Sequence, residues 1–323
     1  MTTTKRYISI TSLLSICIIL VTFIHSSVYA TEGGFGRPLT GLQVMPYGGI
    51  VPPTPGWVFN FSPYFYTGNF GGNKQTPIAG QLAVNLKASA FFGLFTVTHI
   101  WKTNTKKWNF ASGVSAPLAY TDIKADVVLG NINVNRKDTL TSLYDLAFVP
   151  IVASYHISQL RHVAFSVTFW APTGDYEVGR LANNGMNLWT YVPNFSYTQI
   201  WPKSNVELST NYGIGFYQRN PDTDYKSGAL SNLDVLVMKR YKSGYGIGPV
   251  FGWVQQYSDD EGGFAAQLNG FKGRSLGLGA NFTYDTAINQ KTKFSFSARV
   301  VREFAVDNRP EGWPIAFSAS FIF

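Results

Sequence analysis

Apolar and polar residues alternate with a period of two through much of the chain, and the pattern is clear in its last stretch. The alternate residues Ile315, Phe317, Ala319, Phe321 and Phe323 point to one side, and those between them are mostly small or polar. Successive side chains of a β-strand point to opposite faces. The stretch therefore predicts a strand with an aromatic face. Such a strand either closes an outer-membrane barrel with that face towards lipid or is an ordinary buried strand.

The same alternation recurs in earlier segments, with Trp or Tyr towards their ends. These segments lie at 57–66, 108–120, 163–169, 206–216, 245–253, 276–284 and 294–300. Aromatic-ended segments with this period are typical of lipid-facing barrel strands. Segments 86–101 and 143–157 carry apolar residues on both faces, so the pattern defines their faces less clearly.

The connections between these segments alternate between long and short. The long ones are predicted at Gly68–Asn85, Asp122–Ser142, Gly174–Asn187, Arg219–Leu230, Ser258–Phe271 and Ala305–Trp313. The short ones are predicted at Lys102–Lys106, Ser158–Arg161, Trp201–Ser204, Lys242–Gly244 and Ala287–Lys291. Short periplasmic turns and long outer loops are the barrel pattern. We therefore predict an all-β fold: a transmembrane up-and-down antiparallel β-barrel of about 12 strands over residues 57–323, with both termini inside.

The composition supports a membrane barrel. The chain is 45% hydrophobic and 16% aromatic, but only 14% charged, whereas soluble domains carry about 25% charged residues. After residue 30, no apolar run reaches the roughly 20 residues of a membrane helix. The basic residues are scattered and form no stripe, so no nucleic-acid partner is expected.

The first thirty residues have the pattern of a signal peptide. Lys5 and Arg6 precede an apolar run at Tyr7–Ile24, and Val28 and Ala30 have the small side chains of a cleavage site. An uncleaved membrane anchor is the alternative, because the run is long enough to span a bilayer. Cleavage removes Cys17, the single cysteine, and lowers the formal net charge from +8 to +6, since two basic and no acidic residues are lost.

Residues 31–56 are dense in glycine and proline, with Pro52, Pro53 and Pro55 close together. Such a segment does not hold a regular element for long. It also carries apolar residues that a freely disordered tail usually lacks. We therefore expect either a periplasmic lead-in or a plug inside the barrel.

Functional residues of a barrel should face the lumen, because lipid-facing positions have to be apolar. The period of two predicts a set of inward candidates for lining the pore or binding a ligand. They are Asn60, Tyr64, Tyr66, Glu207, Asn211, Asp234, Arg240, Asn281 and Arg299. Tyrosines beside polar groups suit amphipathic solutes. Alternatively, these residues form a polar network that plugs the lumen.

Catalytic and metal sites are not indicated. His99, His156 and His162 lie at the short-loop ends of strands, in what we predict to be separate turns without metal-ligand spacing. An outer-membrane lipase would need a serine and a histidine within reach of one another. The acids Asp222, Asp224 and Asp259–Glu261 could bind Ca²⁺, but solvated loop charge is the simpler interpretation. No catalytic, cofactor-binding or metal-binding residue is therefore predicted, and no cofactor.

Several loop segments resemble the bacterial family named for the MetA pathway of phenol degradation. The matching segments are Glu32–Gly34 with Gly36–Pro38, Tyr47–Gly56, Trp170–Tyr176, Arg180–Asn183 before Trp189, Asp222–Gly228, Leu268–Ser275 and Phe304–Gly312. The resemblance implies an outer-membrane protein that transports aromatic or other hydrophobic compounds.

We therefore expect a barrel in the bacterial outer membrane for passive uptake of small hydrophobic or aromatic compounds. The first alternative is a plugged barrel with a structural or surface-binding role, and the second is an outer-membrane enzyme. Expected partners are outer-membrane lipid, the solutes, and the barrel-assembly machinery through the terminal strand 314–323.

Overall fold

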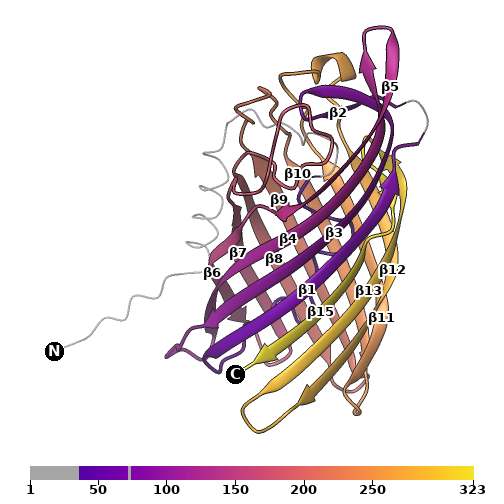
Figure 1. The fold of residues 1–323 in the computed structure, drawn as a ribbon. Helices are drawn as coiled ribbons and strands as arrows, with labels where there is room; N and C mark the ends of the chain where they lie inside the picture. Colours follow the sequence, from indigo (N-terminus) through magenta and orange to yellow (C-terminus); the bar gives the residue numbers. More distant parts are fainter. Residues whose placement is uncertain (1–35, 72–73) are drawn as a thin grey trace, which may run out of the picture.

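The computed structural model describes residues 36–71 and 74–323. Within them, twelve long antiparallel strands form a closed barrel, as predicted (Figure 1). The strands are β1 (Gly56–Asn69), β3 (Gln81–Ile100), β4 (Trp108–Leu129), β6 (Ala147–His156), β7 (Arg161–Trp170), β8 (Thr190–Trp201), β9 (Val206–Tyr217), β10 (Leu230–Arg240), β11 (Tyr245–Gln256), β12 (Arg274–Ala287), β13 (Lys293–Asp307) and β15 (Ile315–Ile322).

The barrel closes where the first strand meets the last. β1 pairs with β3 on one side and with β15 on the other, and Phe59 lies opposite Phe321 in the second pairing. Trp57 and Phe323 then exchange two backbone hydrogen bonds, of 3.2 and 2.9 Å. Closure removes the free sheet edges, as a membrane-spanning sheet requires.

The connections follow the predicted alternation. The long ones gather at one end of the barrel, and the C-terminus and the short turns lie at the other (Figure 1). Within the described ranges the long connections also contain β2 (Thr76–Ile78), β5 (Ile132–Leu143), β14 (Glu311–Gly312) and a short 3-10 helix, η2 (Ala266–Leu268). None of the described helices is both long and apolar enough to cross a membrane.

One predicted connection is wrong. The sequence predicted a long loop at Asp122–Ser142, but β4 continues to Leu129, and its outer part from Leu118 onwards pairs with β5. The two strands turn through Gly130, whose φ of +61° suits glycine. On β5 polar and charged residues occur on both faces and obscure the alternation, because this hairpin projects beyond the barrel wall and most of β5 is exposed (Figure 1).

Aromatic side chains cover the outside of the barrel. Trp57 is 49% exposed and Phe95 is 57% exposed. Outward rings on neighbouring strands also contact each other, as in the stacked pair Phe61 and Phe95 at 4.6 Å. An exposed apolar surface of this size is unfavourable in water and is typical of the outer face of a membrane barrel.

Residues 36–55, here called the inner segment, lie inside the barrel without any helix or strand. Contacts with inward side chains of β4 to β13 hold them there. The signal-peptide prediction for residues 1–30 falls outside the described residues.

A charge on the outer face should weaken the barrel in the membrane. Val300 is 40% exposed on β13, beside the inward Arg299. We expect Val300→Arg to destabilise the folded barrel by about 2–4 kcal/mol, as for arginine near the bilayer midplane. Urea titration of the protein in lipid vesicles measures the change, with Val300→Ala as control. Equal stability of the two variants would contradict the assignment of this face to lipid.

Candidate functional site

The outer end of the inner segment is anchored by a buried ion pair. Arg37 Nη2 lies 2.7 Å from Asp145 Oδ2, and the two side chains are only 3% and 0% exposed. Arg37 Nε also donates to Thr190, and its guanidinium lies 4.8 Å from the centre of the Trp170 ring. Asp145 additionally accepts from the backbone N–H of Gly174 and Met186. The pair thus joins the inner segment to the connection between β7 and β8.

The middle of the inner segment is held by opposite charges on the barrel wall. Asp234 on β10 accepts from the backbone N–H groups of residues 41, 43 and 44, at 3.2, 2.6 and 3.3 Å. Arg299 on β13 donates to the carbonyls of residues 41 and 44, at 2.9 and 2.8 Å. Since irregular backbone has no ladder of its own, these side chains supply the partners that its buried groups require.

A glycine pair lets this part of the segment approach the wall. Gly41 has a φ of +78°, which favours glycine, and it lies against Gly252 on β11. A Cβ atom at Gly252 would come within 2.2 Å of the Gly41 nitrogen. Any side chain at position 252 would therefore push the inner segment towards the centre of the barrel.

The periplasmic end of the inner segment is anchored in the same way. Glu207 on β9 accepts from the Tyr47 N–H at 2.7 Å and also binds Arg240. The Arg240 guanidinium lies 4.3 Å from the centre of the Tyr47 ring. Beyond it, Asn109 at the start of β4 donates to the Val51 carbonyl at 3.1 Å. Inward polar residues therefore fasten the inner segment from one end of the barrel to the other.

A cavity of about 240 Å³ remains between the inner segment and the opposite wall. On the wall side it is lined by inward residues of β1, β3 and β4. They are Tyr64, Tyr66, Ala88, Ala90, Phe92, Leu94, Thr121 and Ile123. On the other side Leu39, Leu42 and Gln43 of the inner segment complete it.

The long connections cover the outer end of this cavity. The lining residues there are Tyr144, Trp170, Tyr176, Leu181, Asn183, Gly185, Met186, Leu188, Asn220, Tyr225 and Ser227. Tyr144 contacts both Phe92 and Trp170 edge to face, at 5.2 and 5.8 Å. The lining is thus mostly apolar and aromatic with a few polar groups, as in small-molecule pockets generally.

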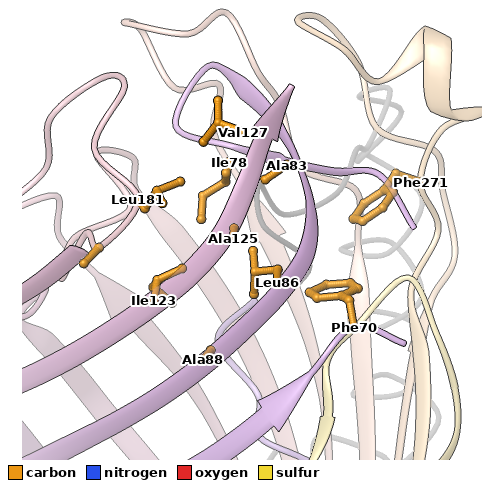
Figure 2. Close-up of a cluster of buried hydrophobic side chains, with 11 residues drawn as sticks. Phe70, Ile78, Ala83, Leu86, Ala88, Ile123, Ala125, Val127, Leu181 and Phe271 are labelled. Atoms are coloured by element: carbon orange, nitrogen blue, oxygen red, sulfur yellow. The ribbon is translucent and has the colours of Figure 1, made fainter. Parts of the chain in front are cut away.

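A hydrophobic cluster fixes the connections that cover the cavity. It joins Phe70 and Ile78 to the outer ends of β3 and β4, to Leu181, and to Phe271. Figure 2 shows these side chains meeting above the barrel, with Leu181 on one side and Phe70 and Phe271 on the other. These side chains are buried against one another. The connections that carry them therefore form a packed cover over the barrel.

Below the cavity, the wall of β15, β1, β3 and β4 carries small polar side chains. Asn60 donates to Ser318 and Ser320, at 2.7 and 2.8 Å. Thr96 and Ser115 bond to each other at 2.7 Å. This part of the wall is therefore hydrophilic and presents no large side chain at these positions.

All nine candidates predicted from the alternation have inward side chains, in two groups. Tyr64 and Tyr66 line the cavity, and Tyr66 also donates to the buried Glu303 at 2.9 Å. The other seven bind the inner segment or polar wall residues instead. They are Asn60, Glu207, Asn211, Asp234, Arg240, Asn281 and Arg299.

Most of the cavity lining was not among the predicted site residues. Ala88, Ala90, Phe92 and Leu94 belong to segment 86–101, where both faces are apolar. Their neighbours in the sequence point outwards, while they face an apolar cavity. On most strands the inward residues are polar, but in segment 86–101 they are apolar. This difference was the signal in the sequence that could have located the cavity.

The prediction of three histidines in separate turns is wrong for two of them. His156 and His162 flank the same turn and lie opposite each other in the β6–β7 pair. Their Nδ1 atoms are 2.6 Å apart, and His156 Nε2 lies 2.5 Å from Asn109 Nδ2. The short β-turn between them brings residues six apart in sequence into register.

The acidic outer loops are only partly solvated. Asp259 pairs with Lys272 at 2.7 Å on the surface, whereas the neighbouring Asp260 is only 5% exposed. Asp260 accepts hydrogen bonds from Tyr225 and from Gln256. In residues 36–71 and 74–323, no three acidic, histidine or cysteine side chains are placed to hold a metal ion.

Breaking the outer anchor should loosen the inner segment. We expect Asp145→Ala to cost about 3–5 kcal/mol, because it leaves the Arg37 charge buried without its partner. Replacing both residues with leucine should be markedly less harmful, since no unpaired charge remains. Urea titration of the three proteins in vesicles tests this. A double variant as unstable as Asp145→Ala would contradict it.

Alkaline pH should open the cover near Asp260. Burial raises the pKa of the Asp260 carboxyl to about 9, against about 3.9 for a free aspartate. The closed loop therefore holds a proton that the open loop releases, and closure weakens as pH rises from about 4 to 9. Limited proteolysis of the loop should increase with pH in the wild type and in Asp259→Asn, but not in Asp260→Asn. Equal pH dependence in all three would refute this.

Comparison with solved structures finds one channel with the same overall fold and other barrels that align less well. An outer-membrane channel from Pseudomonas putida F1 aligns with a TM-score of 0.69 and 13% identity, over 87% of this chain and 100% of the other. A Pseudomonas aeruginosa FadL homologue gives 0.46 and 9%, over 92% and 99%. The Ralstonia pickettii toluene transporter gives 0.41 and 8%, over 92% and 99%. No curated protein sequence matches the chain.

The shared fold and the lipid-facing belt together assign the protein to the bacterial outer membrane. The family model described as "Putative MetA-pathway of phenol degradation" matches residues 71–319, which is most of the chain. The chain therefore belongs to that family.

Proposed function

We propose that the protein is a channel through which small hydrophobic or aromatic molecules cross the outer membrane passively. The observation that carries the proposal is the apolar cavity of about 240 Å³ beneath the outer connections. An apolar cavity of about 150 Å³ is sufficient to bind benzene. The cavity is therefore large enough for one substituted aromatic ring.

The chemistry of the lining supports this class of solute. Phe92, Tyr144 and Trp170 form a series of edge-to-face rings at one end of the cavity. The ring of an aromatic solute can pack against these side chains with either its face or its edge. A sugar would instead leave most of its hydroxyl groups without partners on this apolar lining, which is unfavourable.

The arrangement of the inner segment supports a route past it. The side chains that hold it by hydrogen bonds are on β4 and on strands from β6 to β13. The wall of β15, β1 and β3 opposite carries the small side chains of Asn60 and its serine partners. A solute leaving the cavity would pass along this wall while the anchors stay intact.

The similarity in fold to the Pseudomonas putida outer-membrane channel also supports a channel. A solute that crosses the barrel needs only the cavity lining and the route along the wall. The proposal therefore contains no catalytic step. We further propose that outer-membrane lipid contacts the aromatic belt and that the assembly machinery binds the terminal strand 314–323.

A barrel closed by its inner segment, with a structural or surface-binding role, is the second candidate. The continuous series of buried anchors from Arg37 to Val51 favours it. Liposome swelling separates the two candidates. A channel of the proposed kind admits phenol-like solutes faster than sugars, whereas a closed barrel admits neither.

Filling the cavity should block the channel. Ala90 lines the cavity, and the next residue back, Ser89, points outwards. We expect Ala90→Trp to reduce the rate of swelling with phenol-like solutes several-fold, because the indole occupies the binding volume. Ser89→Trp adds the same side chain outside and should leave the rate unchanged. Equal rates for Ala90→Trp and the wild type would show that solutes do not use this cavity.

A further inference from the structure

Three residues that line the cavity carry buried polar atoms without a partner. They are Arg37 with Nη1, Asn220 with Nδ2 and Ser227 with Oγ. Among the described residues, seven buried side-chain atoms lack a hydrogen-bond partner, so this one cavity accounts for three of them. Unpaired buried groups are rare in native proteins, and each one calls for an explanation.

One loop carries two of these three groups, Asn220 and Ser227, on its cavity side. Residues 218–229 double back so that Arg219 lies opposite Lys226, and the Asn220 N–H donates to the Tyr225 carbonyl. Alternation along the two arms then places Asn220, Tyr225 and Ser227 on the cavity side. Arg219 is on the other side, where it pairs with Asp224 and Glu261.

The unpaired atoms are hydrogen-bond donors. The Asn220 side-chain oxygen accepts from Asn187 Nδ2 and from the Asp222 N–H, both at 3.0 Å. This fixes the orientation of the amide and leaves its NH₂ group as the free end. An arginine nitrogen donates only, and a serine hydroxyl donates or accepts. Their complement is therefore an acceptor atom on a bound molecule.

The charge balance selects a neutral acceptor. Arg37 is the charged residue among those lining the cavity, and Asp145 already compensates it at 2.7 Å. A carboxylate in the cavity would add a buried negative charge without its own counter-charge, which is unfavourable. A ketone, ester or hydroxyl oxygen accepts hydrogen bonds without that penalty.

We propose that the cavity is selective for neutral, mostly apolar molecules that carry a hydrogen-bond-accepting oxygen, which Asn220 and Ser227 recognise. This inference rests on the proposed function, because it specifies the solute that the same cavity holds. The oxygen lies towards the β9–β10 connection, and the hydrocarbon part lies against the apolar side chains of β3 and β4.

Two near-isosteric solutes test the inference. Acetophenone has a carbonyl oxygen where α-methylstyrene has a CH₂ group, and benzoate adds a charge. We expect acetophenone to bind the intact protein in nanodiscs roughly tenfold more tightly than α-methylstyrene. Benzoate should bind more weakly than acetophenone. Titration calorimetry measures all three, with empty nanodiscs as the reference for partitioning into lipid.

A matched pair of variants locates the effect. Ser227→Ala removes a buried, unpaired hydroxyl at the cavity, and Thr76→Val removes one that does not line it. Ser227→Ala should lower the affinity for acetophenone several-fold and leave that for α-methylstyrene unchanged. Thr76→Val should change neither affinity.

The outcomes separate this inference from the proposed function. Equal binding of acetophenone and α-methylstyrene, or an unaltered preference in Ser227→Ala, would overturn the inference while the cavity still holds small hydrophobic molecules. If benzoate bound more tightly than acetophenone, the proposed preference of the cavity for neutral molecules would be wrong. Failure of all three solutes to bind would reject both the inference and the proposed function.

Discussion

The structure depends on hydrogen bonding to the backbone of the inner segment. Residues 36–55 form no helix or strand, so their N–H and C=O groups have no ladder to join. The barrel wall supplies partners from charged side chains that face inwards, notably Asp234 and Arg299. An apolar lumen would leave those backbone groups unpaired and would exclude the segment.

This constraint divides the interior into two halves with different chemistry. Strands that hold the inner segment carry acids, arginines and amides on their inner faces, as Glu207 on β9 illustrates. On the opposite side, Ala90 and Phe92 of β3 face the cavity and carry no charge. The polar half fixes a segment of the protein itself, while the apolar half is left for a solute.

The sequence predicted the barrel well because the lipid requirement acts on every strand separately. Each outward position has to be apolar, so the alternation around residues such as Phe282 and Val300 is visible locally. The number of barrel strands followed from the connections, whereas the strands inside the long connections were missed, chiefly the β4–β5 hairpin. The candidate site was harder to predict. Which inward residues meet the inner segment and which meet the cavity depends on contacts between residues far apart in sequence, such as Arg37 and Asp145. Period-two patterns carry no information on that choice.

The anchors of the inner segment also bear on the order in which the molecule assembles. Gly41 and Arg299 are 258 positions apart along the chain, so neither finds its partner until nearly all the strands exist. Contacts between such distant positions form slowly, because a long loop has to close before they stabilise anything. Until then the wall charges and the segment's backbone stay hydrated. The contacts that hold the inner segment therefore form at the same late stage at which Trp57 and Phe323 join the two ends of the sheet.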